Sequence, residues 1–180
     1  ASKRSRPHII TTQIEHPAIN APCRFLQRFG AEITWLPVDG TGRIDPDGLR
    51  QAISSNTILI SIMHANNETG TIQPIEECAE IAREHGIPFH TDAAQSVGKV
   101  ATRVGDLGVD MLSIAGHKFY APKGVGALYL RARSPRVHLD PVTFGGGQER
   151  GLRPGTLNVP GIVGLGEACR LVGELLDDEA

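Results

Sequence analysis

The stretch TILISIMHANNETGTIQPIEECAEIAREHGIPFHTD, residues 57–92, decides the fold. It begins with a β-branched apolar run over residues 57–63, which predicts a strand. Residues 74–85 then predict a helix that Gly86 closes. The short apolar run over residues 87–91 predicts a second strand. Strand, helix and strand in this order is typical of an α/β protein with a parallel sheet.

The rest of the chain continues the alternation. We predict further strands over residues 9–14, 31–38, 110–114 and 125–130, and helices over residues 17–29, 45–53 and 159–176. The runs that start at residues 57, 87 and 110 are nearly all apolar, as expected for strands buried on both faces. The expected fold is therefore α/β and three-layered, with a mainly parallel sheet flanked by helices.

Composition limits the function. The chain has 180 residues, which suits one domain, and its net charge of -2 gives no electrostatic case for binding nucleic acid or an anionic membrane. No apolar run is long enough to span a bilayer. The three cysteines, Cys23, Cys78 and Cys169, are widely spaced and odd in number. They fit reduced thiols in the core of a cytoplasmic protein better than a disulfide framework.

Polar side chains follow four of the predicted strands. His16 follows the first strand, Asn67 the strand from residue 57, Asp92 the strand from residue 87, and Lys118 the strand from residue 110. If these strands are parallel neighbours, the side chains converge at the carboxyl edge of the sheet, where ligands bind in open α/β folds. Two more polar residues belong to the same turns, Gln95 and His117.

Lys118 suggests covalent chemistry. A lysine in such a site can form a Schiff base with a carbonyl, and pyridoxal 5'-phosphate is its commonest partner. This cofactor needs a carboxylate beside its pyridine nitrogen, which Asp92 can supply. It also needs a flat group against its ring, and His16 is flat and aromatic. The plainer alternatives are a solvated turn lysine, an aspartate that caps a helix, and a packed imidazole.

The remaining polar residues suit the other atoms of the same cofactor. Gln95 or Asn67 can donate to the ring oxygen, and His117 and Thr156 can reach the phosphate. Asn67 could instead be an ordinary turn residue, and Thr156 a capping hydroxyl. Four other histidines show no metal-ligand spacing, so we expect no metal: His64, His85, His90 and His138.

Five motifs carry a family resemblance. They are EHPA at 15–18, NNETG at 66–70, HTDAAQSVGK at 90–99, GHKFYAPKGVGALY at 116–129 and GGGQERGLRPGTLN at 145–158. Together, and in this order, they resemble the cysteine desulfurases of the NifS and IscS type. These enzymes form part of the class V aminotransferase branch of fold-type I pyridoxal phosphate enzymes. The motifs span essentially the whole chain.

The resemblance implies a role for each residue. Lys118 would hold the cofactor covalently, and Asp92 would pair with its pyridine nitrogen. His16 would stack on the ring and assist proton transfer, while Asn67 and Gln95 would contact the ring oxygen or the substrate. His117 would bind the phosphate, and Thr156 would reach the phosphate of a partner subunit in a homodimer. The implied reaction removes sulfur from L-cysteine, giving L-alanine and an enzyme persulfide. A sulfur-acceptor or scaffold protein, as in iron–sulfur cluster assembly, would take the sulfur.

The chain departs from the family pattern at two positions. Ala115 stands where the family often has the serine whose hydroxyl binds the phosphate, so that contact is either lost or moved to Ser113. Pro154 stands where serine is frequent, which stiffens the turn and removes an N–H.

The resemblance also implies missing segments. Family members are roughly twice as long, so we expect residues 1–180 to be part of the large cofactor domain. The N-terminal segment, the loop with the sulfur-accepting cysteine and the C-terminal small domain would be absent, and the fragment would be inactive alone. Two other functions stay open: selenocysteine lyase or another class V enzyme, and a non-catalytic fragment or paralogue that only dimerises or binds a partner.

Overall fold

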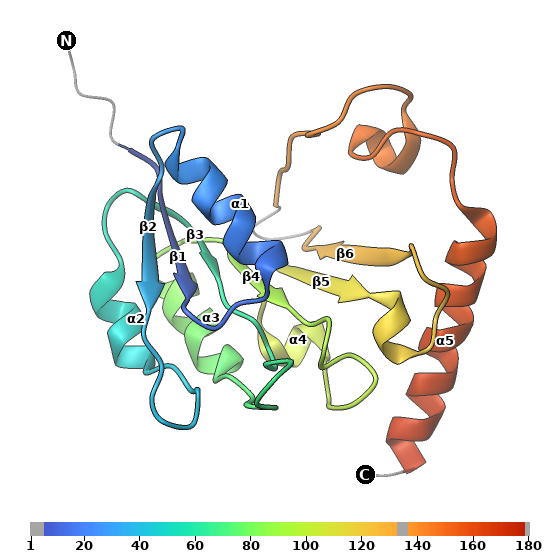
Figure 1. The fold of residues 1–180 in the computed structure, drawn as a ribbon, viewed down its shortest axis with the longest axis horizontal. Coiled ribbons are helices and arrows are strands. Elements are labelled where there is room, and N and C mark those ends of the chain that lie inside the picture. Colours follow the sequence, from blue (N-terminus) through green and yellow to red (C-terminus); the bar gives the residue numbers. More distant parts are fainter. Residues whose placement is uncertain (1–5, 133–136, 179–180) are drawn as a thin grey trace.

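The computed structural model describes residues 6–132 and 137–178, which form one mixed sheet with helices around it (Figure 1). The first five residues of the basic start and the last two of the tail lie outside these ranges. The strands are β1 (His8–Thr12), β2 (Glu32–Leu36), β3 (Thr57–Ser61), β4 (Phe89–Asp92), β5 (Met111–Ala115) and β6 (Gly126–Leu130). The helices are α1 (Pro17–Gln27), α2 (Pro46–Ala52), α3 (Ile75–Glu84), α4 (Val104–Leu107) and α5 (Val159–Asp178), with 3₁₀ turns η1 (Gly116–Phe119) and η2 (Gln148–Gly151).

The six strands form a single sheet in the order β2-β1-β3-β4-β5-β6. The first five strands are parallel, and β6 pairs antiparallel with β5, Met111 lying opposite Leu130. The predicted mainly parallel sheet is therefore confirmed. Its parallel part places the carboxyl ends of β1, β3, β4 and β5 at the same edge.

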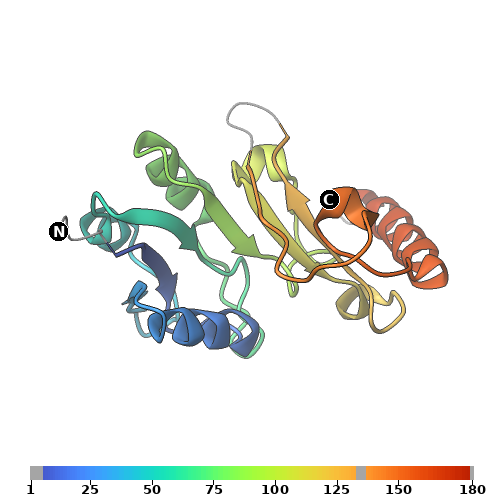
Figure 2. The same cartoon turned by 90° about the horizontal axis from the view of Figure 1, so that it is seen from above.

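The helices form layers on the sheet. Helices α2, α3 and α4 pack beside one another on one face, and α1 lies on the other face (Figure 2). Helix α5 stands at the β6 side and packs against η1. The three-layer α/β fold expected from the sequence is confirmed.

The main core lies between the sheet and the α2–α4 layer. Ile10, Ile60, Phe89 and Leu112 come from four neighbouring strands and are almost completely buried. They meet one face of α3, which includes Cys78. Burying a large aliphatic or aromatic side chain contributes about 1.5–3 kcal/mol. This core keeps the parallel strands, and hence their carboxyl ends, in register.

Local sequence signals define the helix ends. Asp45 caps α2 by accepting a hydrogen bond from the Asp47 N–H at 3.0 Å, as the sequence suggests. Pro17 and Pro46 occupy first-turn positions, where a missing N–H costs nothing. Gly86 follows α3 with a φ of 66°, a left-handed conformation that suits glycine.

One expectation needs correction, and two features were not predicted. Strand β6 is largely exposed, because it is an edge strand with β5 on one side only within the described residues. Cys169 is exposed, since α5 turns Leu165, Ala168 and Val172 toward the protein instead. The short helix α4 was not predicted, because four residues are too few to show a helical period. No helix in the described ranges combines the length and apolar character needed to cross a membrane.

Candidate active site

The carboxyl edge of the sheet brings most of the predicted site residues together. His16 follows β1, Asn67 lies in the loop after β3, Asp92 ends β4, and Lys118 lies in η1 directly after β5. Because these four strands are parallel neighbours, their ends lie side by side. Gln95 follows Asp92, and His117 precedes Lys118.

Asp92 sits at the centre of this edge. It pairs with Ser113 of β5, and its carbonyl accepts the His64 N–H at 2.9 Å, so its backbone is held from both sides. Only 8% of the residue is exposed. One carboxylate oxygen, Oδ1, accepts the Ala94 N–H at 2.9 Å. This contact closes a turn and does not cap a helix, because no helix begins between β4 and α4, and it uses one of the two oxygens.

Lys118 is carried by a turn with apolar anchors. Phe119 is buried with Ala121 against Ala168 of α5, whereas His117 and Lys118 are exposed. Gly116 makes this packing possible, because a Cβ at this position would lie 2.8 Å from the Val125 carbonyl oxygen. The turn between β5 and β6 is thus fixed by its apolar residues and presents its two basic ones to solvent.

His16 serves as the N-cap of α1. Its Nδ1 accepts the Ala18 N–H at 3.1 Å, which leaves the ring proton on Nε2. The ring is exposed, so the alternative of an ordinary packed imidazole is wrong. The cap limits how the ring can turn, and the exposed ring stays accessible to a ligand.

In the NNETG loop, the first asparagine organises the turn. Asn66 is buried, accepts the N–H groups of Glu68 and Thr69 through Oδ1, and donates through Nδ2 to the Ile14 carbonyl at 2.9 Å. Asn67 is exposed and makes none of these hydrogen bonds. The structural role of Asn66 was not predicted; the Asx turn that it forms could have been inferred from the Asn and Gly content of the loop.

Two predicted residues stand differently from the rest. The Gln95 carbonyl Oε1 accepts a hydrogen bond from Lys99 at 3.2 Å, so that atom is already engaged. Thr156 does not come from a strand end. It is exposed and lies in the segment between β6 and α5, which leaves β6 at the opposite edge of the sheet and returns to α5 (Figure 1). Its role toward a partner subunit stays a prediction.

A buried polar row beneath the site was missed. His90 Nδ1 lies 2.8 Å from Ser61 Oγ, and His90 Nε2 lies 2.8 Å from Ser113 Oγ, so the row crosses β3, β4 and β5. Burial lowers the pKa of His90 despite the nearby Asp92, which keeps the imidazole neutral. Two residues apart on a strand, His90 and Asp92 share a face. The alternation of side chains along β4 could have indicated that His90 lies on the same face as Asp92.

The row bears on the missing serine at position 115. Ser113 is the residue to which the phosphate contact was expected to move, but its hydroxyl is bonded to His90. Taking up a phosphate there would require sharing that hydrogen bond. Ala115 itself pairs with Gly126 of β6 and offers no polar side-chain atom.

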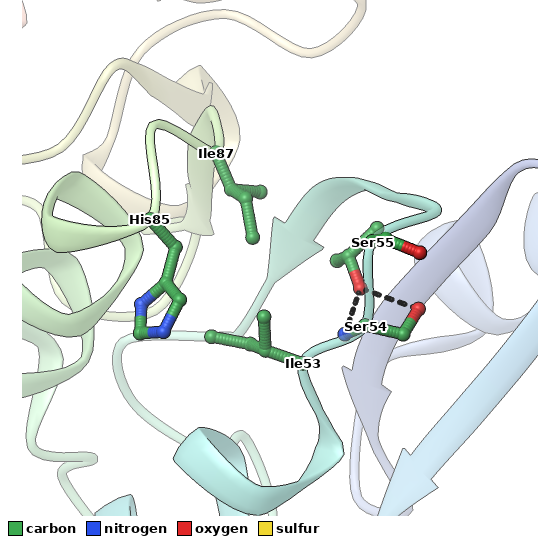
Figure 3. A pocket seen from close by; sticks show the side chains of 6 residues that line it. Ile53, Ser54, Ser55, His85 and Ile87 are labelled. Carbon is green, nitrogen blue, oxygen red and sulfur yellow. Dashed lines mark hydrogen bonds between the residues drawn. The ribbon is translucent and has the colours of Figure 1, made fainter.

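Two cavities are lined by other residues of the chain. One of about 370 Å³ is lined by Ser54, His85, Ile87 and their neighbours at the amino ends of β3 and β4 (Figure 3). The other, of about 350 Å³, lies beside α1 and β2 and is lined by Gln13, Asn20, Arg24 and Trp35. Neither contains a predicted site residue. Within the described ranges, no group of three or more His, Cys, Asp or Glu side chains could hold a metal ion.

The donor set fits pyridoxal phosphate. An exposed amine at Lys118 can bond an aldehyde, and the second oxygen of Asp92 is available to a protonated ring nitrogen. An exposed imidazole at His16 and a second basic group at His117 suit a flat ring and an anionic phosphate. These groups come from the ends of three parallel strands, β1, β4 and β5, at one edge of the sheet.

Comparisons with known proteins agree with this geometry. The model of the family "Aminotransferase class-V" matches residues 1–179. A cysteine desulfurase IscS from Dictyoglomus turgidum is 55% identical over 172 residues, which is 96% of this chain and 43% of that protein. The chain thus spans less than half the length of this curated relative.

Solved structures show the same fold. A NifS-like protein has a TM-score of 0.90 at 42% identity, covering 98% of this chain and 48% of that one. A structure described as SspA in complex with cysteine has a TM-score of 0.86 at 49% identity, covering 93% of this chain and 48% of that one. At these identities the likeness extends beyond the fold to the amino-acid sequence.

Proposed function

Because the chain belongs to the class V aminotransferase family, we propose that it is part of the cofactor domain of a cysteine desulfurase. The complete enzyme would remove sulfur from L-cysteine and leave L-alanine and an enzyme persulfide. The observation that carries the proposal is the placement of Lys118 and Asp92 at the ends of the adjacent parallel strands β5 and β4. An amine and a carboxylate at neighbouring strand ends suit the aldehyde and the ring nitrogen, which lie at opposite ends of a pyridoxal ring.

In this proposal pyridoxal phosphate, when bound, acts as an electron sink for bonds broken at the substrate. Lys118 anchors it covalently and Asp92 keeps its ring nitrogen protonated. His16, oriented by its cap on Ala18, covers the ring, and its Nε2–H is the group available for proton transfer. The other contacts fall to residues of the same turns and of the segment before α5: Asn67, Gln95, His117 and Thr156.

We propose that residues 1–180 form only part of the large domain. The N-terminal segment, the loop with the sulfur-accepting cysteine and the small domain would lie elsewhere in the protein. The buried cysteines support this assignment, because burial raises the pKa of Cys23 and raises that of Cys78 to about 12, which keeps both as unreactive thiols. Cys169 lies on α5, outside the strand ends.

We propose further that the complete enzyme is a homodimer in a reducing compartment, the cytoplasm, and passes its sulfur to an acceptor or scaffold protein, as in iron–sulfur cluster assembly. Thr156 supports the dimer, since it is exposed and its hydroxyl is accessible to a partner subunit. The free thiols support the reducing compartment.

The proposal is tested by mixing the purified chain with pyridoxal phosphate, reducing with borohydride and locating the modified lysine by peptide mass spectrometry. We expect a yellow protein with the label on Lys118. Lys118→Ala should lose both colour and label, whereas Lys123→Ala, which removes an exposed lysine of the next turn, should keep them. A label spread evenly over surface lysines would contradict the proposal. Sulfide release at enzyme rates by this chain alone would contradict the proposal that segments needed for activity lie elsewhere in the protein.

A further inference from the structure

A buried carboxyl, Glu15, lies directly beside His16 and has no place in the site described above. The residue is only 5% exposed. Its Oε1 accepts two hydrogen bonds, from the Met63 N–H at 2.8 Å and from Thr12 Oγ at 2.9 Å. Its Oε2 is buried and has no hydrogen-bond partner among the described residues. An unpartnered buried carboxylate oxygen is costly, and a proton on it removes most of that cost.

The backbone around Glu15 is clamped on both sides. The Ile14 carbonyl accepts a hydrogen bond from Asn66 Nδ2 at 2.9 Å, and the Glu15 carbonyl accepts one from Asn20 Nδ2 at 2.7 Å. The Glu15 side chain adds the link to Met63, just beyond the end of β3. The turn that carries His16 is therefore tied to α1, to the residues after β3 and to the NNETG loop.

The charge of Glu15 depends on its surroundings. Burial and the Asp92 charge raise its pKa, and the hydrogen bonds from Met63 and Thr12 oppose them; together they bring the pKa to about 7. On α1, the Cys23 thiol is the titratable group that senses Glu15 in return. Burial, not a single neighbour, is the largest cause.

We propose that Glu15 is a positioning residue for His16, holding the His16 turn against the end of β3 as a neutral carboxyl whose proton is linked to the charge at Asp92. The proposal rests on the proposed function, because Asp92 is the residue assigned to the cofactor's ring nitrogen. A positive charge beside Asp92 offsets the repulsion between the two acids, so Glu15 then gives up its proton to solvent more readily. The orientation of His16 and the charge at Asp92 are thereby coupled.

The test follows the Met63 amide by ¹H–¹⁵N NMR, since this N–H donates directly to Glu15. Across a titration from about pH 5 to about pH 9, which brackets the raised pKa value, we expect its shift to titrate with a midpoint near 7. In Glu15→Gln the titration should vanish while the amide keeps its position, because glutamine mimics the neutral carboxyl. Glu68→Gln, at an exposed glutamate of the NNETG loop, should leave the titration unchanged.

A second arm tests the link to Asp92, first without cofactor and then with it. Asp92→Asn removes the repelling charge, so the Met63 midpoint should fall below that of the unmutated chain. Addition of pyridoxal phosphate to the unmutated chain should move it in the same direction. If the Asp92→Asn midpoint falls and pyridoxal phosphate does not bind, the proposed function fails and the role of Glu15 stands.

A third arm tests positioning. Glu15→Leu keeps the volume and removes the acceptor, so the His16 and Ala18 amide shifts should move, whereas Glu15→Gln should leave them in place. Far-UV circular dichroism checks that the leucine variant is folded, and the glutamine variant remains decisive if it is not. A Met63 amide that does not titrate, or that titrates equally in Glu15→Gln or with an unchanged midpoint in Asp92→Asn, would overturn the proposal.

Discussion

Glu15, Asp92 and His90 form a group of ionisable side chains below one edge of the sheet, and burial sets the charge of two of them. Burial raises the pKa of Glu15 and lowers that of His90, so near pH 7 Glu15 is only partly ionised and the neutral form of His90 is favoured. Asp92 is the remaining acid, and one of its oxygens accepts the Ala94 N–H. Burial therefore reduces the charge of both neighbours of Asp92, whose second oxygen can meet a cationic ligand group.

Glu15 should make the stability of the chain depend on pH. The folded state binds its proton more tightly than the unfolded state, whose pKa is near the ordinary 4.5. Stability from this group is therefore full below about pH 4.5 and is lost as pH rises through about 7. One pKa unit corresponds to about 1.4 kcal/mol, so the loss is at most about 3 kcal/mol.

Glu15→Gln removes this dependence. Urea unfolding of both proteins at about pH 5 and about pH 8 should show the unmutated chain losing free energy of unfolding relative to the variant. The comparison between the two proteins cancels the opposite contribution of the buried histidines. Equal pH dependence in both proteins would contradict the prediction.

At the scale of elements, η1 is the turn on which the site depends. Its apolar residues pack under α5, and its helical N–H groups and left-handed Tyr120 close it within five residues. The turn is possible because Gly116 lets the Val125 carbonyl and Leu165 of α5 approach its Cα closely. A glycine here serves close packing, not a positive φ.

Gly116→Ala should therefore destabilise the chain by about 1–3 kcal/mol, the usual cost of an added methyl group in a packed site. Gly173→Ala is the matched control. Its Cβ would meet nothing within 4 Å in α5, so it should stabilise by about 0.5–1 kcal/mol through helix propensity. Chemical denaturation measures both changes. If Gly116→Ala is neutral, the close approach in η1 is not limiting.

At the scale of the whole molecule, apolar side chains gather on the half made by η1, the segment before α5, and α5 itself. Val142 is 91% exposed and Phe144 is 85% exposed, and Val163 and Leu175 of α5 are also exposed. Exposed apolar groups of this number are typical of surfaces that pack against another subunit or another part of the chain. They agree with the proposed homodimer.

We therefore expect the 180-residue chain to self-associate, measured by sedimentation velocity over a range of protein concentrations. Phe144→Ser should raise the dissociation constant by about tenfold or more, because burying a phenylalanine contributes about 1.5–3 kcal/mol. Phe29→Ser, at an exposed phenylalanine just after α1, should leave association unchanged. A chain that stays monomeric at all concentrations would count against the dimer.

The alternation of elements and the strand-end residues were predictable from the sequence. Apolar runs of strand length, proline and aspartate at helix starts and glycine at helix ends act locally, so they predict β3, α3 and β4 within a few residues. The carboxyl ends of parallel strands lie at one edge of the sheet, so residues that follow these strands are expected there: His16, Asn67, Asp92 and Lys118. The family motifs add their roles, which stay predictions.

Only the tertiary structure decided which side chains are buried and paired. It exposes β6 because no second strand of the described chain pairs with it, and it turns Cys169 outward because Leu165 and Val172 face η1. It makes Asn66 the support of its loop, joins His90 to two serines on other strands, and isolates one oxygen of Glu15. Each of these depends on contacts between residues far apart in the chain, which local patterns of sequence do not contain.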